Sequence, residues 1–493
     1  MSSSNVRNLH GPRSKEEENK TAVGANTINI GEFSTVSGTM MTIGLFANGG
    51  VRTISEQVKR ASSAAKHLNK LAEREREDAA AKNNSSHKKH KVAVVGAGFS
   101  GITAALELNP DLFEIHVFEK QHALCPLQRD CEVRIFDADI HKWPSSGNDL
   151  QSLEKRSNFA LEGAQSNQSR RATELLDSLN GRSVGTVARE FSKSIIDRID
   201  SGCKSLHVYQ STSYLKIFER LGKFTLDASA RKLTRYGALE DYNLVAQRLG
   251  TPNGTNDDRP FDVCILAIGF GTERTAEDLK TTSYWRNDDR GQVPLYSKRN
   301  AYLISGFGDG ALTDLFRLKI YDYEPIRFLK AIRECLNEET RAKQWSELEA
   351  SIEFARKSSD KGELLTALRN FKMDAAEKTK LKAWLRTDVK VILRMRGPLP
   401  DPLSTIMTYG SMTYNRVIFY FLWIFNGVDL EFSDSCHSVL RAHGIKKSDV
   451  LIRHGSDESI TYRKILSGPL LRQITAKFAA NFEEIPDNWK SAA

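Results

Sequence analysis

Residues 91–108 (KVAVVGAGFSGITAALEL) combine residue types and spacings that suit the binding of a phosphate group. The apolar residues 92–95 predict a short strand that runs into Gly96, Gly98 and Gly101, in the pattern Gly-x-Gly-x-x-Gly, and then into a helix. In this pattern the first glycine permits a tight turn, the second lets the backbone approach a pyrophosphate, and the third allows close packing of the helix on the strand. We therefore expect a dinucleotide-binding Rossmann unit, against the alternative of a glycine turn that only packs a helix on a strand.

The start of the predicted helix and the end of the next strand complete this candidate site. Helical N–H groups near Phe99 and Ser100 have no partner within the helix and carry a partial positive charge toward phosphates. A second apolar strand, residues 115–118, ends at Glu119, which Lys120 follows. A carboxylate at this position accepts hydrogen bonds from ribose hydroxyls and disfavours a 2′-phosphate, so the pattern favours FAD or NAD over NADP.

Two later segments repeat the order of a buried strand followed by glycines. They are residues 259–271 (RPFDVCILAIGFG) and residues 301–310 (AYLISGFGDG). Together with residues 91–108, they resemble the three motifs of the two-dinucleotide-binding flavoproteins. The alternative for both segments is ordinary buried core with glycine turns.

This resemblance implies an α/β fold with a single Rossmann-type FAD-binding domain to which both later strands return. It places Gly269 and Gly308 at the FAD. Asp309 matches the aspartate that in this family binds the ribityl chain or a water at the pyrophosphate. Residues 311–318 would form the helix whose N-terminus points at the flavin.

A nicotinamide site has less support in the sequence. Members of that superfamily that use NAD(P)H carry a second Gly-x-Gly-x-x-Gly motif, and residues 150–260 contain none. The cofactor that the resemblance implies is FAD. For NAD(P)H three alternatives stay open: no site, a degenerate site, or reduction of the flavin by the substrate itself.

The segment after Glu119 contains a pair of cysteines, Cys125 and Cys131. Disulfide reductases that resemble this family hold a C-x4-C pair there, whereas this chain has C-x5-C. A redox pair needs close sulfurs and a lowered thiol pKa. We expect two unrelated reduced cysteines.

The same loop supplies four further candidates, because in many flavoproteins it borders the isoalloxazine ring. An aromatic ring stacks on a flavin, and a guanidinium group holds an anionic flavin or a carboxylate substrate. The alternative is a structural loop whose tryptophan belongs to the core. The four residues are Arg129, Arg134, His141 and Trp143.

Arg453 and His454 form an Arg-His-Gly motif that resembles the start of the histidine phosphatases. That motif needs a second histidine far downstream, and no histidine follows His454. Lining the flavin pocket is the alternative for this pair. No His or Cys spacing resembles a zinc site, so no metal is expected. No residue stands out as an acid or base catalyst.

The domain organisation follows from these motifs and from the composition between them. Residues 1–90 read as a partly disordered leader with one helix, over residues 53–82. The FAD-binding domain covers residues 91–325, with a helical and β-meander insertion at about 146–254. Residues 326–493 read as a mainly helical domain.

Composition bounds the class of protein and its partners. The 493 residues carry a formal charge of +9, and residues 1–90 hold 14 Lys and Arg against 9 Asp and Glu, so more than half of the excess lies there. A basic tail is weaker evidence for nucleic-acid binding than a basic groove, and nucleic acid is not expected. The longest apolar run, residues 417–425, is too short to span a membrane, and the polar start does not resemble a targeting peptide, so we expect a cytoplasmic protein.

The expected function is an FAD-dependent oxidoreductase that transfers a hydride from a small-molecule donor to flavin and on to oxygen or another acceptor. The alternative is a nucleotide-responsive regulatory or effector flavoprotein. It is motivated by residues 24–82 and by the helical C-terminal region, through which the chain would assemble, as a homo-oligomer for example. The sequence assigns neither substrate nor acceptor.

Overall fold

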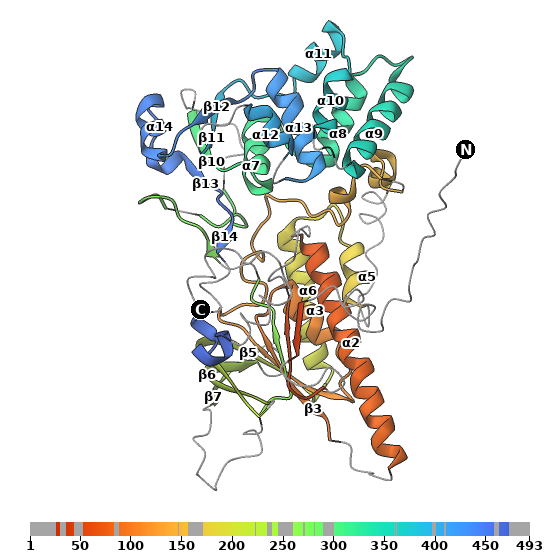
Figure 1. Cartoon of the computed structure of the whole chain (residues 1–493), viewed down its shortest axis with the longest axis vertical. Helices are drawn as coiled ribbons and strands as arrows, with labels where there is room; N and C mark the ends of the chain where they lie inside the picture. Colours follow the sequence, from red (N-terminus) through yellow and green to blue (C-terminus); the bar gives the residue numbers. More distant parts are fainter. Residues whose placement is uncertain are drawn as a thin grey trace, which may run out of the picture. The chain divides into compact units, whose positions relative to one another are not determined.

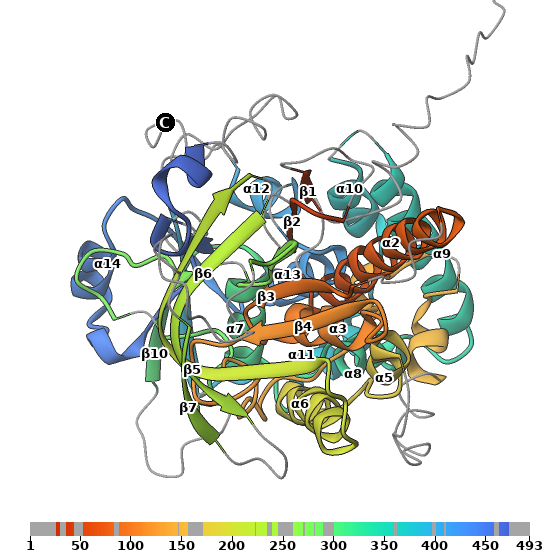
Figure 2. The same ribbon diagram turned by 90° about the horizontal axis from the view of Figure 1, so that it is seen from below.

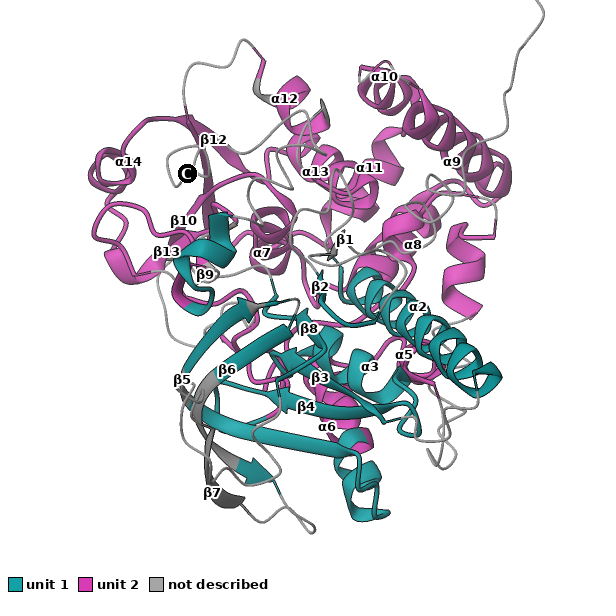
Figure 3. Ribbon diagram, turned by 60° about the horizontal axis from the view of Figure 1, so that its bottom comes forward, with its two compact units in different colours: residues 1–123, 195–269, 465–493 teal, residues 124–194, 270–464 magenta. Residues whose placement is uncertain are grey.

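The computed structural model describes most of the chain and divides it into two compact units. Unit 1 comprises residues 1–123, 195–269 and 465–493, and unit 2 comprises residues 124–194 and 270–464 (Figure 3). The described residues are 26–29, 36–43, 53–82, 88–145, 147–155, 171–221, 223–233, 239–244, 260–269, 272–280, 282–288, 300–358, 360, 362–396, 401–408, 411–457 and 463–472.

Unit 1 is built on an eight-stranded sheet with the order β1-β2-β8-β3-β4-β5-β6-β7. Strands β2, β8, β3, β4 and β5 pair in parallel, whereas β1, β6 and β7 are antiparallel additions. Figure 2 shows β3, β4 and β5 side by side. The strands are β1 (Asn26–Asn29), β2 (Thr39–Thr42), β3 (His90–Val95), β4 (Phe113–Phe118), β5 (Leu206–Arg220), β6 (Lys223–Leu233), β7 (Leu239–Leu244) and β8 (Val263–Leu266).

The centre of this sheet is a Rossmann arrangement, as the sequence predicted for residues 91–118. Taken in chain order, β3, β4, β5 and β8 lie in the spatial order 3-2-1-4, which is the order of a nucleotide-binding half. Helix α3 (Phe99–Glu107) follows β3 directly. Its last carbonyls accept hydrogen bonds from the guanidinium group of Arg198, a favourable charge at a helix C-terminus.

The described parts of residues 1–90 contribute to this unit, in a region where the sequence predicts a leader. Strand β2 pairs with β8 in parallel and so becomes the fifth parallel strand. The predicted helix is confirmed as α2 (Ile54–Ala81), and it packs on α3 (Figure 1). Asn69 of α2 donates to the Glu107 carbonyl and accepts from the Asn109 N–H. Apolar residues on one face of α2, such as Val58 and Leu68, are fully buried, and this burial stabilises the segment.

Strands β5, β6 and β7 form an antiparallel run within the segment for which the sequence predicts a helical and β-meander insertion. Strand β5 begins as a parallel partner of β4 and continues past it to pair with β6. The meander thus extends the Rossmann sheet.

Unit 2 has a parallel sheet of its own, with the order β12-β11-β10-β13. All three strand pairs are parallel, and in chain order the spatial order is again 3-2-1-4. This contradicts the expectation that residues 301–310 return to the first sheet. The region after residue 326, which the sequence predicts to be mainly helical, supplies the other three strands of this sheet. The four strands are β10 (Asn300–Ser305), β11 (Val389–Met395), β12 (Asp429–Phe432) and β13 (Val450–Ile452).

Within unit 2, the helices between residues 309 and 424 share one large apolar core with this second sheet. The short strands β9 (Thr272–Glu273) and β14 (Ser456–Asp457) pair separately. The labelled helices of unit 2 are α5 (Ala172–Asp177), α6 (Val184–Asp200, whose last residues belong to unit 1), α7 (Asp309–Lys319), α8 (Pro325–Cys335), α9 (Arg341–Lys357), α10 (Glu363–Asn370), α11 (Ala375–Lys382), α12 (Pro402–Thr408), α13 (Thr413–Ile424) and α14 (Cys436–His443). The 3-10 turns are η1 (Ile140–Lys142) and η3 (Lys447–Asp449).

No helix within the described ranges combines the length and the apolar character that a bilayer crossing requires.

Candidate nucleotide-binding sites

The first glycine loop, after β3, has the geometry that its three glycines predict. Gly96 has φ +101°, and a Cβ atom there would lie 2.9 Å from the carbonyl carbon of Ala267. A Cβ on Gly101 would lie 2.9 Å from the carbonyl carbon of Gly96. A Cβ on Gly98 would meet no atom within 4 Å. The outer two glycines are therefore required for packing, whereas the middle one faces open space, as the approach of a pyrophosphate requires.

Glu119 lies at the end of β4, where the sequence predicts the ribose-binding acid. Its Oε2 accepts a hydrogen bond of 2.8 Å from the N–H of Ala97 in the glycine loop, and its Oε1 accepts one of 2.8 Å from the N–H of Gln121. The carboxyl group is buried, and burial raises its pKa, although these hydrogen bonds act in the opposite direction. Each carboxylate oxygen has a second lone pair, so Glu119 is still able to accept from ribose hydroxyls.

The other predicted residues of unit 1 lie around this edge of the sheet, with different surroundings. Gly269 follows β8 with φ +71° and open space at its Cβ position. Phe99 is buried, and Lys120 is exposed. The hydroxyl of Ser100 donates to Oε1 of Gln57 in α2 at 3.3 Å, so this side chain is turned to a helix.

Unit 2 contains a second glycine loop of the same kind, after β10. The loop reads Gly306-x-Gly308-x-x-Ala311, a form of the dinucleotide motif in which alanine replaces the third glycine. Gly306 has φ +121°, and a Cβ there would lie 2.9 Å from the carbonyl carbon of Arg453, directly after β13. Gly308 is the N-cap of α7 with φ −75° and ψ −179°, close to the φ −78° and ψ −171° of Gly98 at the N-cap of α3.

The two loops differ in the residue that follows the second strand. The last residue pair of β3 and β4 is Val95 with Phe118, and the last pair of β10 and β11 is Ser305 with Arg394. Glu119 follows in unit 1, whereas Met395 and then the exposed Arg396 follow in unit 2. An arginine near this position accommodates the 2′-phosphate of NADP.

Cationic side chains gather at the same edge of the second sheet. Arg394 is buried; its Nη1 donates to Oγ of Ser305 at 2.8 Å, and its Nη2 has no hydrogen-bond partner among the described residues. Nε2 of His454 lies 2.7 Å from the same Oγ. Burial, and then the charges of Arg394, Arg396 and Arg274, lower the pKa of His454. A buried guanidinium N–H without a partner favours an anionic ligand.

Asp309 lies in this second loop and not in the first site. Its Oδ1 accepts hydrogen bonds from the N–H of Met412 at 2.6 Å and from Nδ2 of Asn415 at 2.7 Å. Burial raises the pKa of the carboxyl group, and these two hydrogen bonds oppose that effect. The aspartate therefore anchors the start of α13 to the start of α7.

The candidates from the loop after Glu119 belong to unit 2. Arg129 is exposed, and Arg134 is buried in an ion pair of 2.7 Å with Asp314. Trp143 is fully buried, and its Nε1 donates to Oε1 of Glu349 at 2.7 Å, so the alternative of a core tryptophan holds.

The remaining candidates have the following surroundings. His141 is half-buried in η1. Cys125 and Cys131 are buried and not joined in a disulfide, and burial raises the pKa of Cys131, the opposite of what a reactive thiolate needs. Arg453 is buried in hydrogen bonds to Asp314 and Glu273.

The structure thus brings Gly96, Gly98, Gly101, Glu119 and Gly269 together, and places Gly308 and Asp309 at another loop. The sequence analysis did not predict the second motif, because it lies after residue 260 and has alanine in place of the third glycine. The pattern Gly-x-Gly-x-x-Ala over the whole chain is the signal that identifies Gly306, Gly308 and Ala311.

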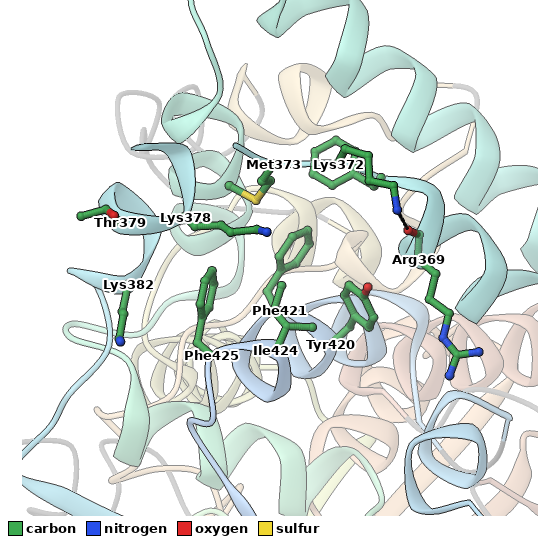
Figure 4. A pocket seen from close by; sticks show the side chains of 11 residues that line it. Arg369, Lys372, Met373, Lys378, Thr379, Lys382, Tyr420, Phe421, Ile424 and Phe425 are labelled. Carbon is green, nitrogen blue, oxygen red and sulfur yellow. Dashed lines mark hydrogen bonds between the residues drawn. The ribbon is translucent and has the colours of Figure 1, made fainter. Parts of the chain in front are cut away.

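Unit 2 also contains a pocket of about 420 Å³. Residues between Arg369 and Lys382, from α10, α11 and their connection, line one part of it, and residues 420–425 at the C-terminal end of α13 line the other. Figure 4 shows aromatic side chains such as Tyr420 and Phe421 together with basic ones such as Lys378. No lining residue belongs to the second glycine loop, whose Asp309 contacts the opposite, N-terminal end of α13.

No protein-family model matches the chain, and no curated protein matches it. Among solved structures it is similar to a bacillithiol disulfide reductase from Bacillus cereus (12% identity, 70% of this chain and 68% of that chain, TM-score 0.30). It is also similar to a cyclohexanone monooxygenase with bound epsilon-caprolactone (12% identity, 77% of this chain and 76% of that chain, TM-score 0.33). A third similar structure is OTEMO in complex with FAD and NADP (12% identity, 77% of this chain and 74% of that chain, TM-score 0.30). TM-scores of this size do not establish a shared fold, so function is argued from the chain's own residues.

Proposed function

We propose that this chain is an oxidoreductase that binds FAD on unit 1 and NADP(H) on unit 2. One observation carries the proposal: the same strand, glycine loop and helix occur twice, each at the centre of a parallel sheet with the order 3-2-1-4. Ordinary core packing does not require a glycine with an open Cβ position beside a helix N-terminus, as at Gly98.

The residues that follow the second strands support this choice of nucleotides. Glu119 suits a ribose with free hydroxyls, as in the adenosine half of FAD. Arg396, with Arg394 and His454 nearby, suits a phosphorylated ribose or another phosphate of the ligand. Flavin, when bound, supplies the hydride chemistry, and the residues named here bind and orient the nucleotides.

The regulatory alternative loses one of its two motives. Residues 26–29, 39–42 and 54–81 contribute strands and a helix to unit 1, so most of the described N-terminal segment has a structural role.

The decisive experiment is anaerobic mixing of the purified protein with NADPH and, separately, with NADH. We expect a yellow protein that releases FAD on denaturation and loses its flavin absorbance faster with NADPH. A colourless protein that takes up no FAD refutes the assignment of unit 1. Flavin that neither nucleotide bleaches refutes the assignment of unit 2.

Variants separate the two sites. Gly98→Trp should abolish FAD binding, whereas Gly308→Trp should leave FAD bound and abolish bleaching by NADPH. Arg396→Ala should weaken the binding of NADPH about ten- to hundredfold and leave that of NADH unchanged, because a charged hydrogen bond contributes about 1.5–3 kcal/mol. Arg356→Ala, an exposed arginine on α9, is the matched control and should change neither. Equal effects of Arg396→Ala on both nucleotides would contradict the role of the 2′-phosphate.

A further inference from the structure

Two histidines and a glutamate meet on one face of the sheet in unit 1, away from the nucleotide-binding edge. Glu114 and His116 are two residues apart on β4 and therefore point to the same face. His207 on β5 is the direct register partner of His116. One donor atom from each of the three side chains lies within 4.8 Å of the other two.

The separations resemble those of a metal site. Nε2 of His116 lies 3.1 Å from Oε1 of Glu114, and Nε2 of His207 lies 3.9 Å from the same oxygen. Tetrahedral zinc holds nitrogen and oxygen ligands at about 2.0–2.2 Å, which places neighbouring ligand atoms about 3.3 Å apart. The two measured distances lie on either side of that value.

The surroundings orient the central histidine. Nδ1 of His116 lies 3.0 Å from the hydroxyl of Tyr209, which leaves Nε2 for the site. The ring is also held between the stacked ring of Tyr209, at 5.8 Å, and the edge of Phe261, at 5.3 Å. Metal-binding histidines commonly use the second ring nitrogen in this way, which fixes the tautomer and the ring orientation.

Burial and charge define what ligand fits. The side chain of His116 is 2% exposed, whereas those of Glu114 and His207 are 20% and 21% exposed, so the group is partly open to solvent. Lys91, whose ammonium group lies 4.9 Å from the ring centre of Phe261, is the nearby cation and opposes binding. Imidazole ligands favour zinc, copper, nickel and iron, whereas magnesium and calcium prefer oxygen.

We infer that Glu114, His116 and His207 bind one divalent first-row transition-metal ion, with Zn²⁺ as the reference ion. The metal joins β4 to β5 at the end of the strands opposite Glu119 and has a structural role there. Sequence spacing did not indicate the site, because its ligands come from two strands that only the sheet brings together.

The test is a zinc titration of the full-length purified chain in competition with a chromophoric chelator. We expect one saturable Zn²⁺ per chain, without competition from Mg²⁺ at the same concentration. Glu114→Gln and His207→Gln should each weaken binding at least tenfold. His443→Gln is the matched control, because Nε2 of His443 lies 3.6 Å from a carboxylate oxygen of Glu431 outside any such three-residue group among the described residues.

Far-UV circular dichroism shows whether the variants fold, and X-ray absorption of the zinc-loaded protein identifies the ligands. Nitrogen and oxygen neighbours at about 2.0–2.2 Å support the site, and a sulfur neighbour at about 2.3 Å overturns it. Absence of saturable binding, equal affinities of folded His207→Gln and the wild type, or displacement by Mg²⁺ also overturns it. None of these measurements depends on flavin or on oxidoreductase activity.

Discussion

Gly96 and Gly98 are two residues apart in one loop, and the structure predicts opposite consequences when each is replaced by alanine. At Gly96, alanine is forced to φ +101° and its Cβ overlaps the carbonyl group of Ala267. The backbone strain costs about 1–3 kcal/mol and the overlap costs about 1–3 kcal/mol, so we expect a loss of about 2–6 kcal/mol in the free energy of unfolding.

At Gly98 the same methyl group has an ordinary φ of −78° and meets no atom within 4 Å. The free energy of unfolding should therefore change by less than about 1 kcal/mol, since alanine is only a poorer N-cap than glycine and restricts the unfolded chain. Nucleotide binding should suffer instead, because the methyl group occupies the space through which the pyrophosphate approaches. We expect FAD affinity to fall at least tenfold, about 1.4 kcal/mol.

The assay compares urea unfolding of the FAD-free proteins with FAD titrations of the folded ones. Far-UV circular dichroism is the appropriate signal for unfolding, because the described tryptophans all lie in unit 2 and report on the other unit. They are Trp143, Trp285, Trp345, Trp384 and Trp423. Wild-type stability of Gly96→Ala, or unchanged FAD affinity of Gly98→Ala, would refute the assigned roles. A loss of stability in Gly98→Ala equal to that in Gly96→Ala would do the same.

Three further predictions concern unit 2. Gly306→Ala should destabilise the protein by about 2–6 kcal/mol in thermal or urea unfolding, because its Cβ meets the Arg453 carbonyl at positive φ; unchanged stability would contradict this. Burial would raise the pKa of Asp314, but the charges of Arg134 and Arg453 hold that pKa at about 2, below its ordinary 3.8. The ionised carboxylate therefore stabilises the folded protein above pH 4, and this stabilisation is lost as the pH falls toward 2. Asp314→Asn should lower the free energy of unfolding by about 3–5 kcal/mol and remove the dependence of stability on pH between about 4 and 2. Acid unfolding followed by circular dichroism measures both, and an unchanged curve would contradict the prediction. Trp143→Phe should lower the free energy of unfolding by about 1–3 kcal/mol, because the indole hydrogen bond to Glu349 is lost. The absorbance spectrum of the flavin should stay unchanged, and a shifted spectrum would indicate that the Trp143 ring contacts the flavin.

Much of the first site was predictable because it is local in sequence. The strand, the three glycines and the helix of residues 91–108 adjoin one another, and steric limits on a β-α turn determine which positions need glycine. Glu119 was predictable for a similar reason, because a short apolar strand that ends in an acid follows at the expected interval. The helix at residues 54–81 also follows from its own periodicity.

The sequence by itself determined that residues 301–310 form a strand, a glycine turn and the start of a helix. It did not determine which sheet that strand joins. Strand pairing is non-local, and an apolar parallel strand has the same pattern in any buried sheet, so only the tertiary structure placed β10 and β3 in different sheets. The meeting of His116 with His207 was decided in the same way, because it depends on the register between β4 and β5, and register is a property of the folded sheet.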